Sequence, residues 1–189
     1  MDQREIDQIC IQIAWLERFL YELDCISQQP LPEMNAHLIT MRQNAPQFFG
    51  MLRYLLVDTI YITIARLLDP PAQRQNTNLT IETIINNNLM DPQERNLALI
   101  KLGEIRSLFQ NGREIRNKII AHPDYQTVYN YPTGLKPIPI DDLQKIGVEI
   151  HLLVNTYFSS TKLPQVLPQN DTSWDGVRKV LELLGSKNL

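Results

Sequence analysis

The residues best suited to chemistry lie in one short segment that runs from Arg116 to His122. An imidazole titrates near pH ~6.5, so His122 can accept or donate a proton at neutral pH. It could take the proton from a ribose 2′-hydroxyl, which would then attack the neighbouring phosphorus. Arg116 would hold the phosphate oxygens through its planar fork of N–H donors. This chemistry needs no metal, and we expect neither a metal nor another cofactor.

Basic charge is concentrated around this segment. The stretch Arg95–Lys118 holds six basic and two acidic side chains and carries +4, whereas the whole chain carries −3. Such a local basic stretch is typical of an anion or phosphate site, and not of a protein that coats nucleic acid along its whole surface. We therefore expect RNA contacts from Arg113, Lys118 and Arg106. The stretch is equally compatible with a solvated helix face that holds pairs such as Glu114–Lys118.

The spacing of Arg116 and His122 restricts how they can act together. On an ideal helix they would lie ~9 Å apart along the axis and ~120° apart around it, so they would not share a face. They can converge because His122 stands at a helix end, just before Pro123, or because a second copy of the helix completes the site. The second route predicts a homodimer. A histidine at a helix C-terminus can also serve only to satisfy the last carbonyls.

These residues match a known signature. The segment Arg116-Asn117-Lys118-Ile119-Ile120-Ala121-His122 resembles that of HEPN domains, in which an Arg is followed by a polar residue and then by a His after four to six intervening positions. Ile64–Pro70 and Asn78–Ile81 look like the corresponding helix end and loop of abortive-infection (Abi) U-type HEPN proteins. His122-Pro123-Asp124 is similar to the end of the motif and the residues after it in those proteins. The resemblance covers roughly residues 40–160.

The resemblance implies an all-α helical bundle, commonly dimeric, with the motif near the dimer cleft. It implies a metal-independent endoribonuclease that acts in phage defence or in a toxin–antitoxin-like system, with RNA as substrate and an antitoxin or other protein as a partner. Arg116 and His122 would then be the catalytic pair, and Asn117 would orient them. The alternative is a non-catalytic helical dimer that binds RNA, a nucleotide or a partner protein.

The elements that position this segment are predicted to be helices. Apolar residues at spacings of three and four predict a helix over residues 5–25, and a helix that is apolar nearly all round is predicted over 47–68. The second would be the long buried centre of the bundle, with Pro46 near its start and Asp69-Pro70-Pro71 after its end. Short helices are expected at 34–43, at 79–85 with Asn78 as its cap, and at 174–184 after Ser173. A longer helix is expected from residue 92, after Asp91, to Ala121, with a kink or split at Asn111-Gly112. Another is expected from Asp141 or Asp142 to about Thr161.

The whole chain, 1–189, is expected to form a single domain. Its core would span about 34–161, its N-terminal helix lies within 1–30, and a linker with a short helix occupies 165–189. A long Pro-rich loop is expected at 123–140, and no strand is expected. Polar residues of the central helix are given structural roles. Arg66 and Asp69 are expected to form an ion pair or a cap at the helix end, with a direct catalytic role as the alternative. Asp58 and Tyr61 are expected to form a buried hydrogen-bonded pair, with a place at the cleft as the alternative.

Several classes are excluded by composition and motifs. Apolar residues make up 43% of the chain and charged residues 21%, which excludes wholesale disorder. Cys10 and Cys25 fit no zinc or redox spacing, so both are predicted to be buried structural thiols. The N-terminus lacks the pattern of a signal peptide, and the apolar stretch Leu55–Leu68 is shorter than the ~20 residues that span a bilayer. We expect a soluble cytoplasmic protein with no membrane partner.

Overall fold

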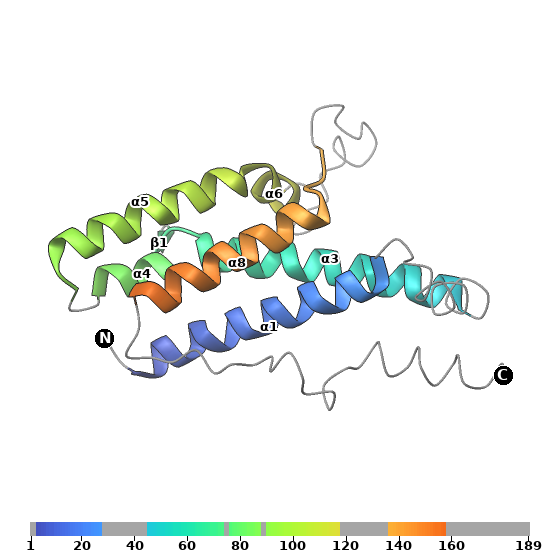
Figure 1. Cartoon of the computed structure of the whole chain (residues 1–189), viewed down its shortest axis with the longest axis horizontal. Coiled ribbons are helices and arrows are strands. Elements are labelled where there is room, and N and C mark those ends of the chain that lie inside the picture. Colours follow the sequence, from blue (N-terminus) through green and yellow to red (C-terminus); the bar gives the residue numbers. More distant parts are fainter. Residues whose placement is uncertain (1–2, 28–44, 74–75, 88–89, 118–135, 158–189) are drawn as a thin grey trace.

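The computed structural model describes residues 3–27, 45–73, 76–87, 90–117 and 136–157 (Figure 1). Within these ranges the protein is all-α, as the sequence predicts. The sole extended pairing there is an antiparallel ladder, unforeseen in the sequence, between two strands of two residues each. The elements are α1 (Gln3–Ser27), α3 (Pro46–Leu68), β1 (Ala72–Gln73), β2 (Asn76–Thr77), α4 (Ile81–Asn87), α5 (Pro92–Leu108), α6 (Gln110–Ile115) and α8 (Ile140–Tyr157).

One apolar core joins these helices. Helix α1 packs along α3 on one side and along α8 on the other, while α5 packs against α8 and α4. The apolar residues that recur every three or four positions along α1 face the core, where most of them are buried. The largest fully buried side chains include Ile9, Ile13, Leu16 and Leu23 from α1, Ile60, Ile64 and Leu67 from α3, and Ile81, Ile84 and Ile85 from α4.

Helix α3 is buried mainly in its C-terminal half, although Phe49 in its first half is also buried. Ile60 and Ile64 are fully buried in the C-terminal half, whereas Phe48, Met51 and Tyr54 in the N-terminal half are more than half exposed. The expected burial along the whole helix is therefore wrong for one face of its first half, which is exposed. By length and composition alone, Pro46–Leu68 is also long and apolar enough to cross a membrane, since the helix extends well beyond the apolar stretch considered in the sequence. Its packing against α1, α4 and α6 is that of a bundle helix.

The start of α4 differs from the prediction by two residues. The capping side chain is Thr80, whose Oγ1 accepts the backbone N–H of Thr83 at 3.2 Å, and the Thr83 hydroxyl lies 3.4 Å from the Thr80 N–H. This is a reciprocal capping arrangement. Asn78 instead ties the loop to the end of α3, because its side-chain amide donates to the Pro70 carbonyl and its backbone N–H to that of Pro71.

The helix expected from residue 92 to Ala121 is divided at Phe109 and not at Asn111-Gly112. Helix α5 begins at Pro92 as predicted, although the Asp91 side chain makes no capping bond. After the break, α6 runs to Ile115, and the next two residues form a wider π-type turn.

Other predictions fall partly or wholly outside the described residues. These are the helices at 34–43 and 174–184 with Ser173, most of the loop at 123–140, and the extension of α8 beyond Tyr157 to Thr161. Helix α8 itself begins at Ile140, so Asp141 and Asp142 lie in its first turn and do not precede it. Cys10 is buried as expected, and burial raises the pKa of its thiol, while Cys25 is half-buried.

Candidate functional site

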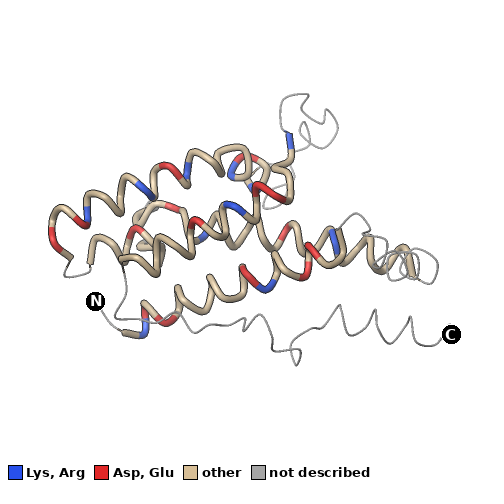
Figure 2. The backbone as a smooth tube through the Cα atoms, viewed as in Figure 1, with Lys and Arg blue, Asp and Glu red and all other residues tan. Residues whose placement is uncertain are grey.

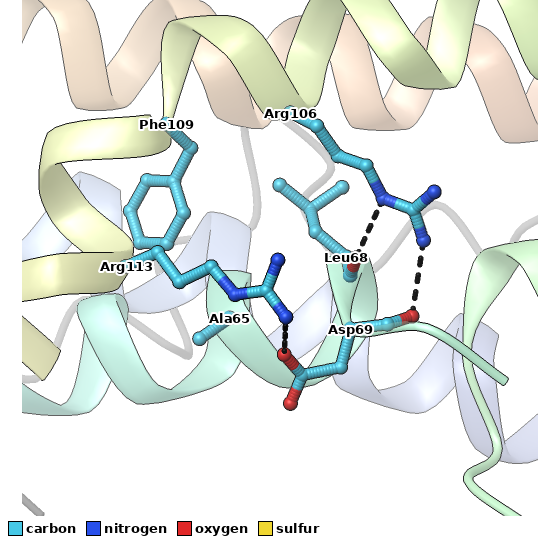
Figure 3. A pocket seen from close by; sticks show the side chains of 6 residues that line it. All are labelled: Ala65, Leu68, Asp69, Arg106, Phe109 and Arg113. Carbon is cyan, nitrogen blue, oxygen red and sulfur yellow. Dashed lines mark hydrogen bonds and ion pairs between the residues drawn. The ribbon is translucent and has the colours of Figure 1, made fainter. Parts of the chain in front are cut away.

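Three arginines from α5 and α6 converge on the C-terminal end of α3. Lys and Arg recur along α5 and α6 (Figure 2), and Arg106, Arg113 and Arg116 point from there toward Leu68 and Asp69. Figure 3 shows Arg106 and Arg113 at this junction. The three side chains do not make equivalent contacts, and the difference separates their roles.

Arg106 is anchored to the backbone of α3. Its Nε donates to the Leu68 carbonyl at 2.7 Å and its Nη2 to the Asp69 carbonyl at 3.1 Å. Nη2 also lies 2.6 Å from a carboxylate oxygen of Glu82 on α4. The last carbonyls of a helix lack intrahelical partners and carry partial negative charge, so a guanidinium is well suited to cap them. The structure therefore favours a positioning role for Arg106 over the predicted RNA contact.

Arg113 and Arg116 are held more loosely, by the Asp69 side chain. Nη2 of Arg113 lies 3.4 Å from Oδ1 of Asp69, and Nη2 of Arg116 lies 3.6 Å from Oδ2. Charge-assisted hydrogen bonds are commonly ~2.7–2.9 Å long, so these are long ion pairs. The two arginine side chains are 48% and 25% exposed, against 14% for Asp69. Two accessible cations thus share one carboxylate.

Asn117 contacts Arg116 directly. Its Oδ1 accepts a hydrogen bond from Nη1 of Arg116 at 2.7 Å, and the same guanidinium reaches Asp69 through Nη2. The two acceptors hold the guanidinium plane from two sides. Asn117 is exposed and Arg116 is half-buried, so this end of α6 faces solvent.

Two predicted structural pairs are not formed. Arg66 is exposed, and the carboxylate of Asp69 reaches Arg113 and Arg116 instead. The physical reason is that Asp69 follows the last helical residue and has extended backbone (φ −61°, ψ 155°), which turns its side chain away from the face of α3.

The second correction concerns Tyr61 and Asp58. The buried hydroxyl of Tyr61 accepts the backbone N–H of Ile138 at 2.8 Å, and the expected bond to Asp58 is absent. Asp58 is half-buried, and desolvation raises the pKa of its carboxyl. Tyr61 therefore ties α3 to the chain just before α8.

The break between α5 and α6 is what aims the arginines at α3. The buried ring of Phe109 packs on that of Tyr61, with ring centres 5.8 Å apart, and turns the chain between the two helices. A cavity of about 20 Å³ remains between Phe109, Arg106, Arg113 and the end of α3 (Figure 3). That volume holds about one water. A larger ligand must therefore meet Arg113 and Arg116 from their outer side.

Lys118 and His122 lie outside the described residues. Asn117 is the last described residue before them, and five residues of extended chain span at most ~18 Å. The Cα atom of His122 is therefore limited to that distance from the Cα atom of Asn117. Of the residues predicted at the site, Arg113 and Arg116 pair with the Asp69 carboxylate, and Asn117 contacts Arg116. Arg106 instead bonds the backbone at the end of α3.

A second polar cluster lies between α1 and α8, beside an open groove of about 360 Å³. Nδ1 of His151 contacts the carboxylate of Glu17, and the side-chain nitrogen of Asn155 lies 2.5 Å from Nε2. Both ring nitrogens therefore have partners, and His151 connects α8 to α1. In the part of the chain that the structure describes, no three His, Cys, Asp or Glu side chains are grouped to hold a metal.

The fold and the site describe an all-α protein in which arginines cluster around one carboxylate, that of Asp69, at the end of a helix. No family model matches the sequence, and comparisons with curated proteins and with solved structures find no significant similarity.

Proposed function

We propose that this protein is a metal-independent endoribonuclease of the HEPN type, acting in the cytoplasm in phage defence or in a toxin–antitoxin-like system. The observation that carries the proposal is the pairing of Arg113 and Arg116 with the carboxylate of Asp69, at distances of 3.4 and 3.6 Å. The two arginines lie in and just after α6, a few residues before His122 in the sequence. Two accessible guanidinium groups that pair with the two oxygens of one carboxylate suit a phosphodiester, which offers two unbridged oxygens.

In the proposed reaction His122 takes the proton of a ribose 2′-hydroxyl. The 2′-oxygen bonds to the adjacent phosphorus, and the bond from phosphorus to the 5′-oxygen breaks. The 5′-oxygen takes a proton from solvent water, and His122 returns its proton to solvent. The products are a 2′,3′-cyclic phosphate and a 5′-hydroxyl. Arg116 and Arg113 stabilise the charge that builds on the phosphate oxygens, and Asn117 holds Arg116 in place. Acid–base catalysis by one group contributes roughly 10²–10⁴ in rate.

We propose further that the protein acts as a homodimer. The first half of α3 exposes Phe48, Met51, Tyr54 and Leu55, and each of these side chains is more than half exposed. A contiguous apolar surface of this kind marks an interaction site. The same surface supports the second candidate function, a non-catalytic helical module that binds RNA, a nucleotide or a partner protein such as an antitoxin.

The test is RNA cleavage by the purified protein in the presence of EDTA. The Arg116→Ala and His122→Ala variants are compared with Arg53→Ala, which removes an exposed arginine of α3 that is not part of the candidate site. We expect 2′,3′-cyclic phosphate ends from the parent and from Arg53→Ala, and none from the other two. Cleavage that persists in His122→Ala would contradict the mechanism. RNA retention without cleavage would favour the binding module.

A further inference from the structure

A second pocket lies on the other side of α6, where α6 faces the start of α8. Its volume is about 330 Å³, which is within the usual range for small-molecule sites. The α5–α6 region contributes Leu108 and Asn111, and the chain that enters and begins α8 contributes Lys136, Pro139 and Lys145. The bond from the Ile138 N–H to the Tyr61 hydroxyl ties one wall of the pocket to α3.

The two lysines of this pocket have no ion-pair partner among the described residues. Lys136 and Lys145 are exposed, and neither makes an ion pair or hydrogen bond with another described residue. Lys101, by contrast, lies 3.2 Å from Glu104 and 2.9 Å from Glu149. Asp142 also lines the pocket, which leaves it with a net charge of +1. The charge favours an anionic ligand.

The remaining walls suit a planar ring. Leu108 is half-exposed, and Pro137 and Pro139 add exposed apolar surface on the opposite side. Asn111 is exposed at the rim, and its amide offers both donors and an acceptor, which is what the edge of a nucleobase needs. A nucleotide is an anion that carries such a ring.

We propose that this pocket binds one nucleotide of the RNA, next to the phosphate held by Arg113 and Arg116. The inference deepens the proposed function and rests on it for the identity of the polymer. On α6, Asn111 stands ~200° from Arg113 around the helix axis, and Arg116 follows in the turn at the end of α6. A strand that touches both sites therefore passes around the C-terminal end of α6, where the residues leading to His122 begin.

The experiment measures binding of the four nucleoside 5′-monophosphates by calorimetry and by amide NMR, which requires no cleavage. The Lys136→Ala/Lys145→Ala double variant is compared with Arg53→Ala/Lys101→Ala, which removes the same charge elsewhere. We expect the first variant to lose at least about tenfold in affinity and to lower the slope of log affinity against log salt by about one to two. The control should bind as the parent does, and binding should shift the amide signals of Asn111 and Ile138.

A third variant separates the ring from the phosphate. Leu108→Ala should weaken binding of the nucleotides and leave binding of inorganic phosphate unchanged. No nucleotide binding by the parent, or equal losses in both double variants, would overturn the inference. Loss of RNA cleavage in the Arg116→Ala variant with nucleotide binding intact would support two distinct sites, whereas nucleotide binding by a parent that never cleaves RNA would count against the proposed function alone.

Discussion

The ring of Phe109 lies in the space that a Cβ atom of residue 112 would occupy. A Cβ built on Gly112 would stand 2.6 Å from Cδ2 and 2.7 Å from Cζ of that ring. Both residues are buried, and the ring also packs on Tyr61 of α3. The missing side chain at position 112 therefore lets α6 fold back over the ring. This contact sets the angle at which Arg113 and Arg116 leave α6 toward Asp69.

Gly112→Ala should destabilise the fold. Overpacking a core costs about 1–3 kcal/mol, and the helical preference of Ala over Gly returns up to ~1 kcal/mol. We expect the free energy of unfolding to fall by about 1–2 kcal/mol in urea titrations. Gly103→Ala is the matched control, because nothing lies within 4 Å of a Cβ at that position of α5. That variant should be as stable as the parent or more so. Equal effects in the two variants would mean that Phe109 does not fill the site.

Arg106→Lys should destabilise the protein although it keeps the charge. A lysine has no planar fork, so it cannot donate to the Leu68 and Asp69 carbonyls while it also pairs with Glu82. Hydrogen bonds from charged groups contribute about 1.5–3 kcal/mol, and we expect a loss in this range in thermal or urea unfolding. A variant with parental stability and weakened RNA binding would instead make Arg106 an RNA contact.

Asp69→Asn should strengthen RNA binding at low salt. The Asp69 carboxylate occupies donors of Arg113 and Arg116 that a phosphate would use, so its charge competes with the ligand. A pair that contributes up to ~1 kcal/mol corresponds to an affinity gain of about fivefold. Asp91→Asn, with the same charge change at the far end of α5, controls for net charge. A fall in affinity in Asp69→Asn alone would show that the carboxylate orients the arginines.

Asp58→Asn should stabilise the protein at neutral pH. Desolvation raises the pKa of Asp58 above its ordinary value of 3.8, so between the two values the folded state binds more protons than the unfolded state. Stability therefore falls as pH rises through that window, and the cost of the half-buried carboxylate is fully present above it. Unfolding measured at pH 7 should favour the variant, and the difference should vanish below pH 3.8. A constant difference at both pH values would exclude the charge as its cause.

Local patterns predicted most of the described helices. The apolar periodicity over residues 5–25 gave α1 to within two residues at each end, and Pro46 with Asp69-Pro70-Pro71 bounded α3 correctly. These signals are local, since they depend on spacing and on the geometry of proline.

Tertiary contacts were not predicted. Gly112 was the obvious breaker in the helix from residue 92, but the chain turns at Phe109, because the ring of Phe109 has a partner in Tyr61 of a distant helix. In the same way Arg66 was the nearest cation to Asp69 in sequence, whereas the extended backbone of Asp69 turns its carboxylate toward α6. No spacing rule along one helix encodes either contact.

Tyr61 fastens the chain at two points, one before α6 and one before α8. Its ring receives Phe109, ahead of α6, and its hydroxyl receives the Ile138 N–H, ahead of α8. Residues 118–135 thus connect two points fastened to a single side chain of α3. The entropy of closing a loop grows slowly with length, by only ~0.6 kcal/mol for each doubling. A change in the length of the chain between those points therefore costs the bundle little closure entropy, as long as both fastenings to Tyr61 remain.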